Sequence, residues 1–139
     1  MNIEPYLFFE GRCEEALRFY RDTLGAEILA LMRYAESPDA ANCATQMPPD
    51  KVMHALLRIG QSKVMASDGM CSGQPQFKGM ALTINADTDA DARRLFDALA
   101  AGGQVSMPMG PTFYASSFGM VSDRFGVSWM VIKALDAHA

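Results

Sequence analysis

The chain has 139 residues, half of them hydrophobic, and its formal net charge of −4 is mildly acidic. This charge offers no basic surface for nucleic acid, and no apolar run approaches the ~20 residues of a membrane-spanning helix. The N-terminus lacks the basic and then apolar segment of a secretory signal, and three widely spaced cysteines are typical of reduced thiols. We therefore expect a cytoplasmic protein without nucleic-acid or membrane partners, whose cysteines are Cys13, Cys43 and Cys71.

The first half of the chain predicts a strand, a helix and three further strands. An apolar, aromatic segment at the start of this half predicts a strand. The segment after it has apolar residues at helical spacing and ends at a glycine. A long segment rich in proline, aspartate and alanine predicts a loop. The elements are a strand over 3–9, a helix over 13–25, a strand over 27–34, the loop over 35–51 and a hairpin over 52–59 and 63–67.

The second half repeats this order, so the chain contains two βαβββ modules. Its elements are a strand over 79–86, a helix over 90–103, and strands near 104–107, 116–122 and 127–132. We expect an α+β fold in which the modules pool their strands into one curved mixed sheet, with helices outside and a hollow for a ligand inside. We treat 1–139 as one domain, with module 1 over about 1–68, a loop over 69–78 and module 2 over about 79–135.

Three segments resemble the vicinal oxygen chelate superfamily, which includes glyoxalase I, bleomycin-resistance proteins and extradiol dioxygenases. They are 6-YLFFEGRCEEALRFYRDTLGAE-27, 54-HALLRIGQSKVMASD-68 and 102-GGQVSMPMGPTFYASSFGMVSDRFGVSWMV-131. The closer resemblance is to the PhnB-like branch, also labelled 3-demethylubiquinone-9 3-methyltransferase. The resemblance implies a glyoxalase/bleomycin-resistance fold and pairing of two chains. It does not by itself define a reaction.

The resemblance also allows the usual metal site of the superfamily to be checked position by position. Members that use a metal take ligands from the first and last strand of each module. Here those positions fall at Pro5, Met65, Gly79 and Met130. These residue types do not form a cage of imidazole and carboxylate for a divalent ion. We therefore expect no metal, and we expect no methyl-donor cofactor because the chain lacks a glycine-rich strand-to-helix turn.

His54 is the main candidate for a catalytic or ligand-binding residue. Alternation along 52–59 places His54, Leu56 and Arg58 on one face of the strand, and the purely apolar face should pack under a helix. His54 could then act as a general base or orient a ligand in the hollow, and Arg58 could hold an anionic group. The common alternative is a structural histidine that bonds to a neighbouring strand.

Ser67, Asp68 and Tyr114 are further candidates for ligand binding. Ser67 and Asp68 end the hairpin, where an acid could meet a substrate hydroxyl, although Asp68 followed by Gly69 is also an ordinary turn. Tyr114 could stack on a flat ligand and donate a hydrogen bond, or it could pack at a strand edge.

Near the C-terminus the alternation places Met130 in the hollow as a ligand-binding candidate and turns Trp129 into the core. Asp123, before a glycine-containing turn, is typical of an Asx-turn. Cys71 has no neighbour in sequence that would lower its pKa, so we expect an unreactive thiol.

The leading prediction is a PhnB-like protein that binds a small organic metabolite in a methionine-lined hollow and forms a homodimer. Two alternatives remain open. The protein could be an enzyme, without a metal or with an unusual one, that uses His54 as its base. It could also sequester a drug or metabolite without any reaction. The sequence does not decide whether the protein is an enzyme.

Overall fold

The computed structural model describes residues 1–36 and 47–135, so part of the predicted loop over 35–51 and Cys43 lie outside the described residues. The chain divides into two compact units, Met1–Pro75 (unit 1) and Gln76–Ala139 (unit 2). The boundary falls in the segment predicted as the loop between the modules. In the described parts of the chain, no helix is long and apolar enough to cross a membrane.

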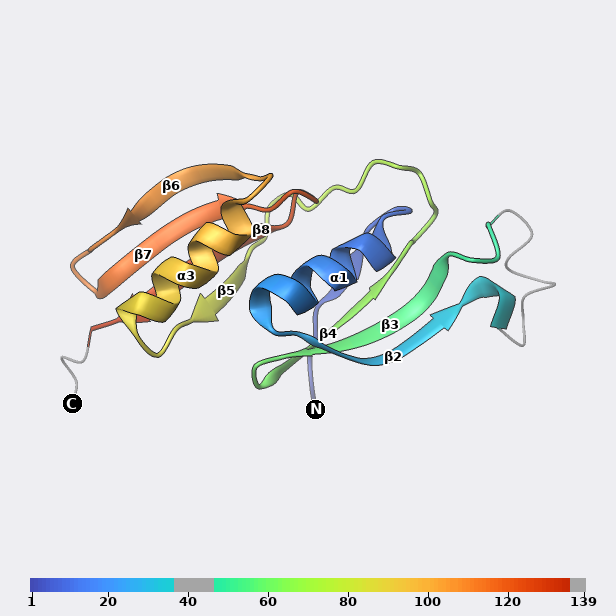
Figure 1. The fold of residues 1–139 in the computed structure, drawn as a ribbon, viewed down its shortest axis with the longest axis horizontal. Coiled ribbons are helices and arrows are strands. Elements are labelled where there is room, and N and C mark those ends of the chain that lie inside the picture. The colour runs from blue at the N-terminus through green and yellow to red at the C-terminus, as the bar shows by residue number, and fades with distance from the viewer. Residues whose placement is uncertain (37–46, 136–139) are drawn as a thin grey trace. The chain divides into compact units, whose positions relative to one another are not determined.

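In the described residues of unit 1, one four-stranded sheet carries the long helix α1 on one face (Figure 1). The strand order is β1-β4-β3-β2, and β1 runs parallel to β4 while the other pairs are antiparallel. Its elements are β1 Tyr6–Phe8, α1 Cys13–Leu24, β2 Glu27–Arg33, the short 3-10 helix η1 Tyr34–Glu36, β3 Val52–Ile59 and β4 Ser62–Ser67.

Unit 2 repeats the arrangement with the strand order β5-β8-β7-β6. Its elements are β5 Leu82–Asn85, α3 Asp89–Ala100, β6 Gln104–Gly110, β7 Ala115–Ser122 and β8 Ser128–Ala134. The predicted α+β class and the order of elements in both modules are thus confirmed. We expected all strands to pool into one sheet, whereas the described strands form two hydrogen-bonded sheets. The reason is that β1 and β5 each pair with the last strand of their own module.

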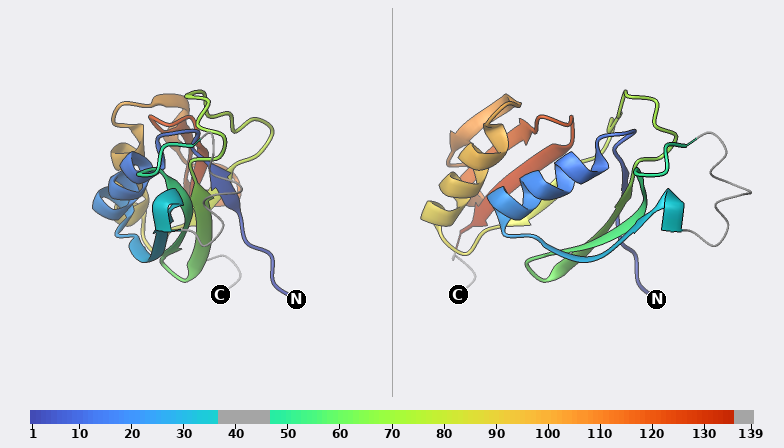
Figure 2. Two further views of the ribbon diagram at one scale, coloured as in Figure 1. Left: turned by 90° about the vertical axis from the view of Figure 1, so that its right-hand side faces the viewer. Right: turned by 45° about the vertical axis from the view of Figure 1, so that its right-hand side comes forward.

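Each helix has a stripe of apolar side chains along one side and a residue that favours its start or its end. In α1 the buried side chains recur every three or four residues, and Gly25 ends the helix at a φ of 68° that favours glycine. At the start of α3 the Thr88 side chain accepts a hydrogen bond from the Asp91 amide at 3.0 Å. Both helices therefore bury one stripe against their own sheet (Figure 2).

Candidate functional site

The two faces of the sheet in unit 1 differ in their covering. Side chains under α1 are almost fully buried, and they alternate along each strand with side chains on the other face, as expected for strands. We call that second face the open face of unit 1. The buried set is Leu7, Ala55, Leu57, Val64 and Ala66. The open-face set is Tyr6, Phe8, Ala30, Met32, His54, Leu56, Arg58, Lys63 and Met65. The placement of His54, Leu56 and Arg58 agrees with the alternation expected from the sequence.

Strand register arranges the open face in rows that cross the sheet. In the middle row, Leu56 lies opposite both Ala30 and Met65, and Met65 lies opposite Tyr6. The row is apolar apart from the Tyr6 hydroxyl. On one side of it, His54 lies opposite Met32. Phe8 and Met32 expose 51% and 40% of their surface, so this face presents large apolar groups outside the core.

His54 meets the phenol of Tyr6 on this face. The Tyr6 hydroxyl lies 3.0 Å from His54 Nδ1, and the two ring centres are 5.6 Å apart. Phe8 stacks on the Tyr6 ring at 4.9 Å, which restricts the phenol. When the hydroxyl donates to Nδ1 of a neutral imidazole, the proton of the ring resides on Nε2. Among the described residues Nε2 has no hydrogen-bond partner, so it remains available as a donor.

Tyr6 was not predicted as a site residue. Its position in the first strand, two residues from Phe8, indicated a shared face, but its contact with His54 spans 48 residues of sequence. Only the parallel pairing of β1 with β4 brings the two strands into reach. No local pattern encodes that pairing.

Arg58 lies on the same face, beyond Leu56, and forms an ion pair. Its Nη2 donates to both carboxylate oxygens of Glu27, at 2.9 and 3.0 Å. Both side chains are about half exposed, so the pair contributes little to stability. The structure thus places His54 and Arg58 on one face without bringing them into contact with each other.

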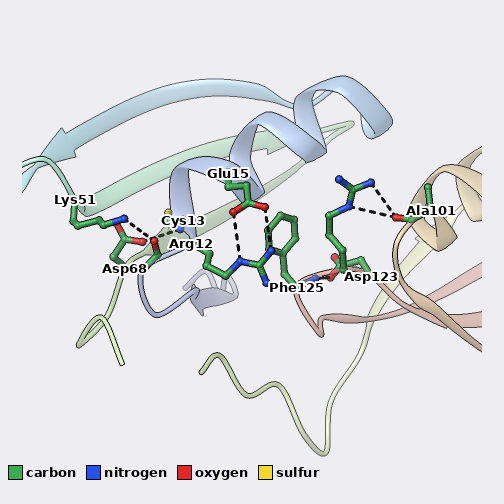
Figure 3. A network of polar contacts seen from close by, with 10 residues as sticks. Arg12, Cys13, Glu15, Lys51, Asp68, Ala101, Asp123 and Phe125 are labelled. Carbon is green, nitrogen blue, oxygen red and sulfur yellow. Dashed lines mark hydrogen bonds and ion pairs between the residues drawn. The ribbon is translucent and has the colours of Figure 1, made fainter. Parts of the chain in front are cut away.

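Asp68 is buried and serves the backbone. Its carboxylate accepts the Cys13 amide at 2.7 Å and the Val52 amide at 2.6 Å, one on each oxygen. Arg12, at the start of α1, gives no side-chain cap, so Asp68 supplies the negative charge that this helix end favours (Figure 3). Asp68 therefore links the starts of α1 and β3 to the end of β4. Burial, and then the Asp68 charge, raise the pKa of the Cys13 thiol.

Ser67 contributes its side chain to the turn at Gly69. It is nearly fully buried, and its hydroxyl accepts the Gly69 amide at 3.1 Å. Alternation places it beside His54 in the rows of the open face, but its burial leaves little surface for a ligand. The structure thus gives Ser67 and Asp68 structural contacts.

The segment after Asp68 is held by Glu10. The Glu10 carboxylate accepts the Met70 amide at 3.3 Å and the Ser72 amide at 3.2 Å, and its carbonyl accepts the Gly73 amide at 2.8 Å. Glu10 and Cys71 both adopt left-handed φ angles of 52° and 55°. Burial, and then Asp68, raise the pKa of the Cys71 thiol. This thiol is therefore disfavoured as a nucleophile, in line with the expectation that it is unreactive.

Unit 2 has a corresponding face without a helix, and methionines form one row on it. A Cβ on Gly119 would meet Phe96 of α3, so residue 119 faces the helix and Met120 faces away. Met120 lies opposite Met130 on one side and Met107 on the other. Met130 therefore lies on the face of this sheet that is turned away from α3.

Tyr114 follows β6 and is partly exposed at 44%. Its ring contacts Phe113 and Phe118 edge to face, at 4.9 and 5.8 Å. The backbone carbonyl of Tyr114 accepts the Leu135 amide, which fixes the segment to the end of β8. The exposed edge of the phenol is compatible with either alternative for Tyr114.

Asp123 and Trp129 are core residues of unit 2. Asp123 Oδ1 accepts the amides of Phe125 and Val127 at 2.9 and 3.1 Å, and Oδ2 accepts Nε1 of the buried Trp129 at 2.9 Å. The Asx-turn and the core position of Trp129 are therefore confirmed. The indole contact extends the turn into a link with β8.

The described residues contain no cluster of three or more histidine, cysteine, aspartate or glutamate side chains that could hold a metal ion. Met65 donates its amide to the Pro5 carbonyl at 3.0 Å, so these two superfamily positions are neighbours. Gly79 was assigned to the first strand of module 2, but β5 begins at Leu82 and Thr83 lies opposite Met130. The assignment of Gly79 was therefore wrong, and the neighbour of Met130 is a hydroxyl side chain.

The fold matches that of known proteins over nearly the whole chain. A crystal structure of protein PA1353 from Pseudomonas aeruginosa is 45% identical, with a TM-score of 0.84, and the match covers 98% of this chain and 99% of that one. A PhnB protein from Bacillus cereus is 27% identical with a TM-score of 0.80, covering 96% and 100%. The fosfomycin resistance protein FosX from Listeria monocytogenes, 8% identical with a TM-score of 0.65, shares the fold alone.

These similarities define a protein of the glyoxalase/bleomycin-resistance fold in the PhnB-like branch of the vicinal oxygen chelate superfamily. A family model described as 3-demethylubiquinone-9 3-methyltransferase matches residues 1–132, and the chain belongs to that family. Protein YjdN of Escherichia coli (strain K12) is 40% identical over 138 residues, which is 94% of each chain.

Proposed function

We propose that this protein binds a small organic molecule on the open face of unit 1, with His54 Nε2 as the polar contact and without a divalent metal ion. The observation that carries the proposal is the Tyr6–His54 hydrogen bond on a face that α1 leaves uncovered. The bond fixes the imidazole and directs its free nitrogen away from Tyr6. A ligand oxygen could accept from that nitrogen while its apolar part covers the row of Leu56 and Met65.

The chemistry of the surrounding side chains supports this proposal. Largely apolar surfaces with a few fixed polar groups are typical of small-molecule sites. Methionine side chains are flexible and polarisable, and they adapt to ligands of different shape. In unit 1, Met32 lies opposite His54 and Met65 lies opposite Leu56. The residues at the superfamily's ligand positions, including Pro5, Met65 and Met130, do not suit a divalent ion.

The same geometry favours one alternative, an enzyme in which His54 removes a proton. For this role His54 needs the other tautomer, in which Nδ1–H donates to the Tyr6 hydroxyl and Nε2 is free to accept the proton. Recovery of the ligand distinguishes the two functions, because a sequestering protein returns the bound molecule unaltered. Conversion of the bound molecule by the wild type, and its loss in His54→Gln, would establish that the protein is an enzyme.

The binding proposal can be tested with the neutral fluorescent probe phenylnaphthylamine, which has an apolar body and no charge. We expect saturable binding to the wild type and loss of binding in Leu56→Glu, which places a charge in the apolar row. Val105→Glu is the matched control, because Val105 is an exposed apolar residue of unit 2. Equal binding by all three proteins, or no saturable binding to the wild type, contradicts the proposal.

We also propose that the protein forms a symmetric homodimer. Each four-stranded sheet ends in edge strands, and an edge presents unpaired backbone groups. Exposed apolar side chains accompany them, including Leu29 on β2 and Met107 on β6. A stable interface would bury above ~2,000 Å² in total. Sedimentation equilibrium should give twice the 15.2 kDa of one chain, and a mass of one chain at micromolar concentration contradicts this.

A further inference from the structure

The open face of unit 1 carries a row of charges at the end opposite His54. Arg58 lies opposite Glu27 on one neighbouring strand and opposite Lys63 on the other. Two like charges directly opposite each other destabilise a sheet. This row contains two cations and one anion, so a local positive charge remains in a chain whose net charge is −4.

The hydrogen bonds of this row leave donors available. One guanidinium nitrogen of Arg58, Nη2, serves both oxygens of Glu27. Within the described residues, the other donors of Arg58 and the ammonium group of Lys63 have no partner. A bound anion at this position would relieve the repulsion between the two cations and use these donors.

The distance along β3 gives the length of a ligand that reaches both ends. Arg58 and His54 are four residues apart on one face, which corresponds to about 13 Å between their backbones. Leu56 lies between them, in the apolar row with Ala30 and Met65. The face therefore has a cationic end, an apolar middle and the His54 imidazole at the other end.

We propose that the ligand is an elongated amphipathic oxyanion. Its carboxylate, sulfonate or phosphate group binds Arg58 and Lys63, its apolar body covers Leu56 and Met65, and an oxygen at the far end accepts from His54 Nε2. This inference rests on the proposed binding function and names its ligand class. An apolar body over the middle row excludes water beside the charges, which strengthens their attraction to the oxyanion.

Two probes with the same aromatic body separate the charge from the apolar contact. Anilinonaphthalene sulfonate carries an oxyanion, and phenylnaphthylamine is its neutral counterpart. We expect the wild type to bind the sulfonate more tightly than the neutral probe. Lys63→Gln should lower the affinity for the sulfonate about three-fold, the effect of one partly exposed charge. It should leave the affinity for the neutral probe unchanged. Arg58→Gln should lower the affinity for the sulfonate more, because Glu27 then loses its partner.

The matched control is Arg18→Gln, which removes one positive charge from α1 on the other side of the sheet and should change neither probe. If both probes bind the wild type but Lys63→Gln and Arg58→Gln leave the sulfonate affinity unchanged, the ligand class is wrong and the binding function stands. An equal loss of both probes in these variants also contradicts the ligand class. If neither probe binds saturably, the binding function fails as well.

Discussion

The Tyr6 hydroxyl lies 3.0 Å from Nδ1 of His54, and this bond joins the first strand of unit 1 to its third. When the hydroxyl donates to Nδ1, the neutral imidazole carries its proton on Nε2. The relationship gives His54 a fixed orientation on the face of the unit 1 sheet that α1 does not cover. It is the structural basis of the proposed site.

Replacing Tyr6 by phenylalanine should remove the preference of neutral His54 for one tautomer. In the wild type we expect the ring nitrogens of neutral His54 to show one protonated Nε2 and one unprotonated Nδ1 in long-range proton–nitrogen NMR spectra. In Tyr6→Phe the Nδ1 atom loses its donor, so the two tautomers should mix while the fold is retained. His138, the second histidine of the chain, serves as the internal reference. Unchanged nitrogen shifts of His54 in the variant would show that Tyr6 does not set the tautomer.

Asp68→Asn should lower the free energy of unfolding strongly. The amide group has one acceptor oxygen, whereas the Asp68 carboxylate accepts two backbone amides in a buried position. One amide would then face the side-chain NH2 group, at a cost of about 3 kcal/mol for the lost charged hydrogen bond and the unsatisfied donor. Urea denaturation measures the effect. Asp50→Asn is the control, because it removes a nearby exposed carboxylate, and an equal loss in both variants contradicts this account.

Gly69→Ala and Gly60→Ala separate two costs of adding a methyl group. Both glycines have similar left-handed φ angles, 56° and 60°. A Cβ at residue 69 would collide with the Glu10 carboxylate, while a Cβ at residue 60 meets nothing within 4 Å. We expect both variants to lose about 1 kcal/mol from backbone strain. Gly69→Ala should lose about 1 kcal/mol more, because Glu10 must release the Met70 and Ser72 amides. Equal melting temperatures for the two variants would contradict the contact.

The Glu14–Arg33 pair should make stability depend on pH. Hydrogen bonding to Arg33 lowers the pKa of Glu14 below its ordinary value of 4.5. A lowered folded-state pKa gives stability that is present above the ordinary value and is lost as the pH falls through the folded-state value. The side chains are about one third exposed, so solvent screens the pair and we expect a small contribution. Between pH 6 and pH 3 the wild type should lose more stability than Arg33→Gln. If the wild type and Arg33→Gln lose the same stability over this pH range, the pair makes no such contribution. The control is Arg21→Gln, which breaks the exposed ion pair with Asp22.

Much of this structure follows from local sequence patterns, and the remainder depends on long-range pairing. Alternation along 52–59 placed His54, Leu56 and Arg58 correctly, and the turn at Asp123 was predicted from its residue types. The position of Gly79 was wrong because the register of β5 against β8 is set by hydrogen bonds between distant strands. The role of Asp68 was open for the same reason, since its contact with the Cys13 amide spans 55 residues of sequence.

Native mass spectrometry of freshly purified protein tests the central claim most directly, because one spectrum reports bound organic molecules and metal ions together. The account predicts an organic adduct on the wild type that Leu56→Glu lacks and Val105→Glu retains, with no divalent metal in stoichiometric amount. A mass increase of one zinc, nickel, iron or manganese ion per chain that survives dialysis would contradict it. An organic adduct that persists unchanged in Leu56→Glu would contradict the proposed place of binding.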